Sequence, residues 1–260
     1  MTIKIVFFDL DGTIVDNQTD QVPISTIQSI KALHSKGIQV VLATGRSYFF
    51  TKSVGRLLKV QNFINCSGSY VRLGHEEVYK DPISQNDFDH LVQICSLNGD
   101  HLSCFGVEDS YSNGLAKEVA LPILKNIDCH EIPSIFPHRK VEYMGMCLFL
   151  SNGNINDYHN ISTELQFYHW GENIPNAYNI ERKGNNKANA IQKVLQHFNF
   201  SADEAIAFGD GINDIEMLQT VRIGVAMGNA REGLKEKADF ITKNVDDDGI
   251  YHALKTLNVI

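Results

Sequence analysis

The two ends of the chain share a pattern that strongly limits how it can fold: a short apolar segment, a polar turn and then an amphipathic helix. At the N-terminal end, an apolar segment over 3–10 precedes a helical pattern over 24–33, and a second apolar segment follows over 38–43. Short, uniformly apolar segments are typical of strands that are buried on both faces of a parallel sheet. Strand, helix and strand in this order predict a βαβ unit.

The C-terminal third of the chain repeats this pattern. An amphipathic helix is predicted over 188–198, apolar strands over 205–208, 223–226 and 238–242, and a final helix over 250–257. Both ends therefore predict a single α/β fold that is built on a parallel sheet.

The middle of the chain follows a different pattern. A helical segment precedes four predicted strands, which alternate between apolar and polar residues more than the strands at the ends: 102–107, 142–150, 165–170 and 177–182. Such alternation is typical of a sheet with one covered face. We expect an α+β domain over 83–183 that is inserted into an α/β core formed by 1–82 and 184–260.

Composition limits the classes of partner. The chain has 260 residues, a hydrophobic content of 43% and a formal net charge of −8. This acidic balance argues against a nucleic-acid-binding protein, because binding to phosphate backbones needs a basic surface. The sequence contains no apolar run of the roughly 20 residues that cross a bilayer, and no signal-peptide pattern. We therefore expect neither a nucleic acid nor a membrane as partner.

The cysteines are widely spaced and form no Cys-x-x-Cys pair: Cys66, Cys95, Cys104, Cys129 and Cys147. This spacing argues against a disulfide framework and against a cysteine zinc site. We expect reduced thiols in a cytoplasmic protein.

Two carboxylates directly follow the first predicted strand, in the sequence Asp-Leu-Asp-Gly-Thr. Asp9 and Asp11 are separated by one residue and point roughly the same way, and Gly12 permits a sharp turn. An EF-hand loop has its glycine at the sixth position, whereas this loop has it at the fourth. Paired carboxylates after so apolar a strand are costly unless a cation neutralises them.

Two further candidates are weaker when they are taken alone. Thr44 and Gly45 follow the second strand, where a hydroxyl and free backbone N–H groups suit a phosphate oxygen, although Thr44 could simply cap the next helix. Lys187 begins a helix and so faces the unfavourable end of the helix dipole, which a nearby anion would reverse. An isolated lysine is more often a solvated surface residue.

The fourth candidate is the sequence Gly-Asp-Gly-Ile-Asn-Asp after the strand 205–208. Asp210, Asn213 and Asp214 form a cluster of oxygen ligands, or an acidic cap of the next helix. If the four loops converge, four aspartates meet one lysine, and each like-charge pair at about 4 Å costs roughly 4 kcal/mol at an effective dielectric of 20. We therefore expect a divalent cation, and oxygen ligands favour Mg²⁺. Such a set around one phosphate describes phosphoryl transfer.

These four motifs, in this order, resemble those of the haloacid dehalogenase (HAD) superfamily. The insert between the second and third motifs is similar to the type-two cap of that superfamily. The stretches 43–46, 187–191 and 207–218 resemble the Cof-type phosphatases. The resemblance implies a HAD-like Rossmannoid core with an α+β cap that determines substrate specificity. It also implies a Mg²⁺-dependent phosphatase that hydrolyses a small phosphorylated metabolite, a sugar phosphate or a phosphorylated cofactor, through an aspartyl-phosphate.

The resemblance assigns a role to each motif residue. Asp9 is the expected nucleophile, and Asp11 the expected general acid and then base, which also lends its backbone carbonyl to Mg²⁺. The expected phosphate-binding residues are Leu10, Thr44, Gly45, Lys187 and Asn213. The expected metal ligands are Asp9, Asp11, Asp210 and Asp214.

The match departs from the family pattern in two loops. Ser67-Gly68 stands where relatives often have Asn-Gly, and 179–184 replaces an Asp-Ile-x-Pro-x-Gly run. These departures concern the substrate rather than the chemistry. A phosphotransferase or phosphomutase on the same core, and a catalytically silent binding or regulatory protein, remain alternatives. We expect hinges near 80–84 and 183–186, and a monomer or weak homo-oligomer.

Overall fold

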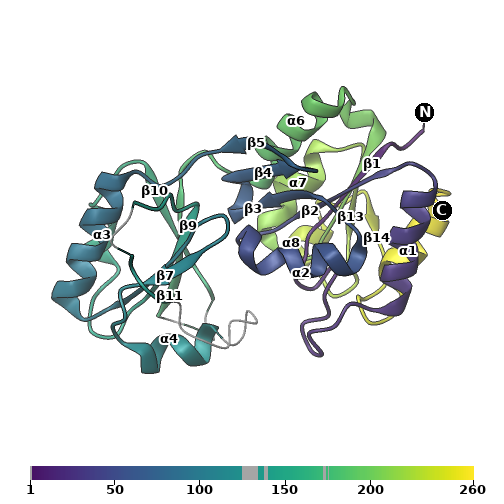
Figure 1. The fold of residues 1–260 in the computed structure, drawn as a ribbon. Helices are drawn as coiled ribbons and strands as arrows, with labels where there is room; N and C mark the ends of the chain where they lie inside the picture. Colours follow the sequence, from purple (N-terminus) through teal and green to yellow (C-terminus); the bar gives the residue numbers. More distant parts are fainter. Residues whose placement is uncertain (1, 125–133, 138–139, 172–173, 175) are drawn as a thin grey trace. The chain divides into compact units, whose positions relative to one another are not determined.

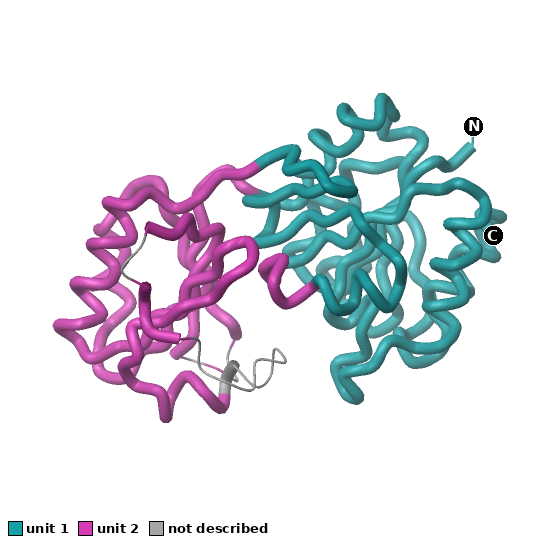
Figure 2. The backbone as a smooth tube through the Cα atoms, in the orientation of Figure 1, with its two compact units in different colours: residues 1–45, 52–79, 186–260 teal, residues 46–51, 80–185 magenta. Residues whose placement is uncertain are grey.

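The computed structural model describes residues 2–124, 134–137, 140–171, 174 and 176–260 (Figure 1). The chain divides into two compact units (Figure 2). Unit 1 contains 1–45, 52–79 and 186–260, and unit 2 contains 46–51 and 80–185. Each unit has a sheet of its own.

The sheet of unit 1 has eight strands in the order β14-β13-β12-β1-β2-β3-β4-β5. The first six of these are parallel to one another, and β4 runs antiparallel to β3. Their bounds are β1 Ile5–Phe8, β2 Gln39–Ala43, β3 Asn62–Asn65, β4 Tyr70–Leu73, β5 Glu76–Lys80, β12 Ala205–Gly209, β13 Ile223–Ala226 and β14 Phe240–Ile241. The α/β fold with a parallel sheet is confirmed.

The helices of this part of the chain include the predicted ones. They are α1 Ile24–Ser35, α2 Tyr48–Leu58, α6 Lys187–Phe198, α7 Ile215–Thr220, α8 Glu232–Lys235 and α9 Gly249–Thr256, with short 3-10 turns η1 Cys66–Gly68, η3 Ala202–Glu204 and η4 Ile212–Asp214. The helical pattern over 24–33 counted Ile24 as part of the apolar face, and this detail is wrong. Ile24 is 74% exposed, and the buried face of α1 consists of Thr26, Ser29, Ile30 and Leu33.

The register between the two central strands positions the loops that carry the motifs. In the parallel pairing, Phe8 lies beside Phe208, with their ring centroids 4.9 Å apart. The N–H of Asp9 continues the ladder to the carbonyl of Phe208 at 2.9 Å. The loops after β1 and β12 therefore begin at the same level of the sheet, at its carboxyl edge.

Unit 2 contains a second sheet of six strands in the order β10-β11-β9-β6-β7-β8. The strands are β6 His101–Phe105, β7 Ser110–Ser112, β8 Ser134–Ile135, β9 Gly145–Phe149, β10 Leu165–His169 and β11 Ala177–Arg182. The helices are α3 Gln85–Asn98, α4 Lys117–Leu124 and α5 Asn156–His159. Among the described elements of this unit from α3 onward, each helix is followed by two strands, which gives the α+β character expected for the middle of the chain.

The expectation of one covered face is wrong for the two central strands of this sheet. Every residue of β6 and β9 is buried. Because neighbouring residues of a strand point to opposite faces, Leu102 and Leu148 enter one apolar cluster, whereas Phe105 and Phe149 enter another that includes Ala120 of α4. Both faces are therefore packed at the middle of the sheet.

The four described cysteines are free and buried, and Cys129 lies outside the described residues. Within the part of the chain that the structure describes, no helix is long and apolar enough to span a bilayer.

Candidate active site

The centre of the site is a buried lysine that joins two carboxylates from different loops. Lys187 is the first residue of α6, after the N-cap Asn186, and its side chain is only 2% exposed. Its Nζ donates to Asp9 Oδ1 at 2.5 Å and to Asp214 Oδ1 at 2.6 Å. The structure therefore answers the question that the sequence left open, because this lysine is not a solvated surface residue.

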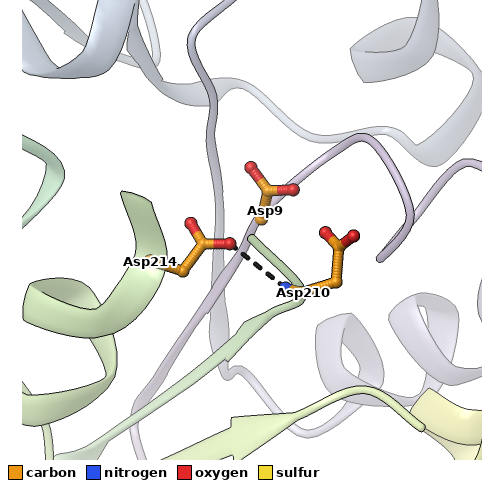
Figure 3. Close-up of side chains that lie close together, drawn as sticks. All are labelled: Asp9, Asp210 and Asp214. Atoms are coloured by element: carbon orange, nitrogen blue, oxygen red, sulfur yellow. Dashed lines mark hydrogen bonds between the residues drawn. The ribbon is translucent and has the colours of Figure 1, made fainter. Parts of the chain in front are cut away.

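A third carboxylate belongs to the same cluster. Asp9, Asp210 and Asp214 each offer an oxygen, and these oxygens all lie within 4.8 Å of one another (Figure 3). Asp214 is fully buried, and its Oδ2 accepts the backbone N–H of Asp210 at 3.1 Å and of Gly211 at 3.0 Å. It thus also closes the turn before α7, the structural role that its sequence position suggested.

The electrostatics of the cluster show an excess of negative charge. Burial raises the pKa of the Asp9 carboxyl well above its ordinary value, and the charge of Asp214 raises it further, against the opposing effect of Lys187. Burial and Asp214 also raise the pKa of Asp210 to about 6. Burial by itself lowers the pKa of Lys187, but Asp214 and Asp9 outweigh this effect and raise it.

The donor set of this cluster suits a hard divalent cation. Three carboxylates against one ammonium leave two negative charges uncompensated in a nearly buried site. A divalent cation would balance these charges, and carboxylate oxygens are the ligands that Mg²⁺ and Ca²⁺ prefer. The cluster is therefore a candidate metal site.

The turn after Asp11 packs directly against this cluster. Gly12 has a φ of 77°, and a Cβ added there would lie 2.3 Å from Asp210 Oδ2. Thr13 Oγ1 donates to Asp210 Oδ1 at 3.3 Å. The glycine is thus needed both for the left-handed backbone conformation and for the close approach of the Asp210 carboxylate.

The other predicted site residues lie on the same edge of the sheet or in its turns. Asp11 is partly buried, and its carboxylate is not part of the close cluster of Asp9, Asp210 and Asp214. Its charge nevertheless contributes to raising the pKa of Asp9. The Leu10 side chain is fully buried, so only its backbone could meet a ligand. Thr44 is 1% exposed and directly follows β2, whereas Gly45 and Asn213 are exposed.

One residue that holds the site together was missed from the sequence. Asn229 Nδ2 donates to the carbonyl of Gly12 at 2.8 Å, and its Oδ1 accepts the N–H of Val245 at 2.8 Å. Asn229 follows β13, the neighbour of β12 in the sheet. The rule that found the other motifs, a polar residue after a buried parallel strand, would have found this one as well.

The fold and this site together define a class: an α/β core that carries acidic motifs at the carboxyl edge of a parallel sheet. The model of the haloacid dehalogenase-like hydrolases matches residues 6–254. The chain belongs to this family and, within it, to the Cof-type phosphatases, as the motifs predicted.

Curated and solved relatives cover essentially the whole chain. The "Putative phosphatase YkrA" of Bacillus subtilis (strain 168) is 34% identical over 265 residues, with 100% of both chains covered. A hypothetical protein of Geobacillus kaustophilus HTA426 has a similar structure, with a TM-score of 0.91, 33% identity and coverage of 99% of this chain and 100% of that one. The HAD subclass IIB sugar phosphatase BT4131 is similar with a TM-score of 0.80, 29% identity and coverage of 99% and 100%.

Proposed function

We propose that this phosphatase depends on Mg²⁺ and hydrolyses a small phosphorylated metabolite, a sugar phosphate or a phosphorylated cofactor, through an aspartyl-phosphate on Asp9. The observation that carries the proposal is the buried contact of Lys187 with Asp9 and Asp214, 2.5 and 2.6 Å long, beside Asp210. Three carboxylates and a lysine are not buried this close together on an ordinary solvated surface.

Asp9 is the proposed nucleophile. Lys187 bonds its Oδ1 and favours the ionised form against the effect of burial, so we assign the attack on phosphorus to Oδ2. The new bond joins Oδ2 to phosphorus, and the bond between phosphorus and the leaving oxygen breaks. Asp11, two residues further along the same turn, donates a proton to that oxygen.

Hydrolysis of the intermediate reverses the role of Asp11. Asp11 takes a proton from a water molecule, whose oxygen bonds to phosphorus while the bond to Asp9 Oδ2 breaks. The products are inorganic phosphate and a free Asp9 carboxylate. A covalent nucleophile of this kind divides one difficult displacement into two easier ones.

The proposed ligands of Mg²⁺ are Asp9, Asp210, Asp214 and the backbone carbonyl of Asp11. When it is bound, the ion supplies positive charge that offsets both the carboxylate cluster and the phosphate dianion. Phosphate oxygens would be held by the Lys187 ammonium and the Thr44 hydroxyl, and by groups of Leu10, Gly45 and Asn213. The exposed positions of Gly45 and Asn213 support this assignment, because a substrate can reach them.

We assign the chemistry to the proposed core, 1–82 and 184–260, and substrate choice to the proposed cap, 83–183. The segments that enter and leave the cap support hinges near 80–84 and 183–186. Arg182 pairs with Asp81 at 2.8 Å, and Asn185 Nδ2 donates to the second oxygen of Asp81 at 2.8 Å. Arg182 belongs to the run 179–184 that departs from the family pattern, so its ion pair with Asp81 uses a residue of that departure.

The remaining proposals concern the setting of the enzyme. Four buried free thiols support a cytoplasmic location, where thiols stay reduced. The net charge of −8 supports a small phosphorylated molecule, rather than a nucleic acid, as the partner. We propose a monomer or weak homo-oligomer.

The test is release of inorganic phosphate from 4-nitrophenyl phosphate by the wild-type protein and by Asp9→Asn, with Mg²⁺ and with EDTA. We expect turnover that requires Mg²⁺ and is lost in Asp9→Asn. Asp203→Asn, at an exposed position of the same unit, is the matched control and should retain wild-type turnover. Equal rates in wild type and Asp9→Asn would contradict the proposal, and transfer of phosphate to a sugar without release of inorganic phosphate would favour the phosphotransferase.

A further inference from the structure

We propose that Asn229 is a positioning residue that holds the turn carrying Asp11 in place for proton transfer to the leaving group. This inference rests on the proposed function, because it assigns Asn229 a part in the step that Asp11 performs. Asn229 acts through the backbone and need not touch the substrate. It lies outside the four motifs described above.

The two hydrogen bonds of Asn229 fix the direction of its amide. Its Oδ1 faces a donor, the N–H of Val245 at 2.8 Å, and its Nδ2 faces an acceptor, the carbonyl of Gly12 at 2.8 Å. Rotating the amide by 180° would place donor against donor and acceptor against acceptor. Asn229 therefore joins the loop at Val245 to the Gly12 carbonyl in one orientation only.

Gly12 is the residue through which Asn229 contacts the turn that carries Asp11. It directly follows Asp11 and has the left-handed backbone conformation, with a φ of 77°. The turn closes on itself through backbone hydrogen bonds, among them the Gly12 N–H to the carbonyl of Val15 at 2.8 Å, but these do not tie it to the rest of the sheet edge. Asp210 lies against Gly12 as well, and Asn229 adds a contact that does not belong to the carboxylate cluster.

Asn229 is itself carried by well-anchored backbone. Met227 donates its N–H to the carbonyl of Gly209 at 3.0 Å, and Gly228 donates to Lys243 at 2.9 Å. Ala230 closes the turn with a bond to the carbonyl of Met227 at 3.0 Å. The turn that presents Asn229 is thus tied to the end of β12, and Asn229 transfers this fixed position to the turn that carries Asp11.

The consequence should depend on the leaving group. Misplacing a catalytic group by about 1 Å costs on the order of 100-fold in rate, and losing one of several contacts to its turn should cost about tenfold. Protonation by Asp11 matters most when the leaving oxygen is strongly basic, as in phenyl phosphate. It matters much less for 4-nitrophenyl phosphate, whose leaving group is stable as an anion and whose size is similar.

The experiment compares kcat/KM for phenyl phosphate and 4-nitrophenyl phosphate in the wild-type protein, Asn229→Ala and Asn62→Ala. Asn62 is a matched control in the same unit, because it too bridges a carbonyl, of Val40 at 3.1 Å, and an N–H, of Gly74 at 3.2 Å. We expect Asn229→Ala to reduce kcat/KM about tenfold more for phenyl phosphate than for 4-nitrophenyl phosphate. Asn62→Ala should change both values by the same factor.

A second variant removes only the hydrogen bond from Asn229 to the Gly12 carbonyl. Asn229→Asp can still accept the N–H of Val245 but cannot donate to the Gly12 carbonyl, so it should show the same selective loss. Equal losses for the two esters in both Asn229 variants would overturn this inference alone. A wild-type protein that hydrolyses neither ester, or an Asp9→Asn variant as active as wild type, would overturn the proposed function and this inference with it.

Discussion

Replacing Lys187 by methionine tests the central contact of the site. The substitution keeps an unbranched side chain of similar length, with sulfur in place of one methylene, and removes the ammonium group. Lys187 is 2% exposed and bonded at 2.5 and 2.6 Å to Asp9 and Asp214. The variant therefore leaves two nearly buried carboxylates without the cation that they share.

The size of the effect follows from this burial. Removing one partner of a buried ion pair typically destabilises a protein by about 3–5 kcal/mol, because the other charge stays buried and uncompensated. For a chain of this length, the melting temperature should fall by on the order of 10 °C. Loss of Lys187 also removes the effect that opposes the raised pKa of Asp9.

The destabilisation should therefore depend on pH in a defined direction. A carboxyl whose pKa is higher in the folded than in the unfolded protein contributes stability at low pH, and this contribution is lost as the pH rises through the folded pKa. Without Lys187, the pKa of Asp9 rises further. The difference in stability between wild type and Lys187→Met should consequently be larger at pH 8 than at pH 5.

The assay is thermal unfolding followed by circular dichroism in EDTA at both pH values, with Lys193→Met as control. Lys193 lies on the same helix, with its Nζ 4.2 Å from the centre of the Tyr79 ring, a contact worth about 0.5–1 kcal/mol. If Lys187→Met is no less stable than Lys193→Met at pH 8, then the buried network does not exist as described.

Two further predictions concern the same cluster. The rise in melting temperature caused by Mg²⁺, measured by differential scanning fluorimetry, should be larger at pH 8 than at pH 5. Protons compete with the ion at Asp9 and at Asp210, whose pKa is about 6. Equal rises at the two pH values would argue against a metal site here. Gly12→Ala should reduce turnover strongly and destabilise the protein more than Gly37→Ala. Both glycines have a positive φ, but a Cβ at Gly12 would meet the Asp210 carboxylate, whereas a Cβ at Gly37 would have no atom within 4 Å. The strain of the left-handed conformation alone costs about 1–2 kcal/mol, and equal losses in the two variants would show that the contact with Asp210 does not matter.

The sequence by itself determined the type of fold and the chemistry of its loops. Buried strands over 205–208 and 223–226 were predicted within a residue of their observed bounds, because short, uniformly apolar runs between polar turns are typical of the interior of a parallel sheet. The residues with ligand chemistry stand directly after such strands, so their common edge followed from topology alone. Local patterns are sufficient for both inferences.

Only the tertiary structure decided which of these residues meet and how they are buried. The register that places Phe8 beside Phe208 brings Asp9 level with the loop of Asp210, and nothing local in either strand specifies that pairing. The sequence made Lys187 a candidate, but it did not show that the side chain is buried. The buried contacts join Lys187 to Asp9, 178 positions away, and to Asp214, 27 positions away. The place of Asn229 after β13 can be read from the sequence, but its hydrogen bond to Gly12 cannot, because the two residues are 217 positions apart. Contacts between distant segments depend on how whole elements pack, and the period of a single segment carries no information about them.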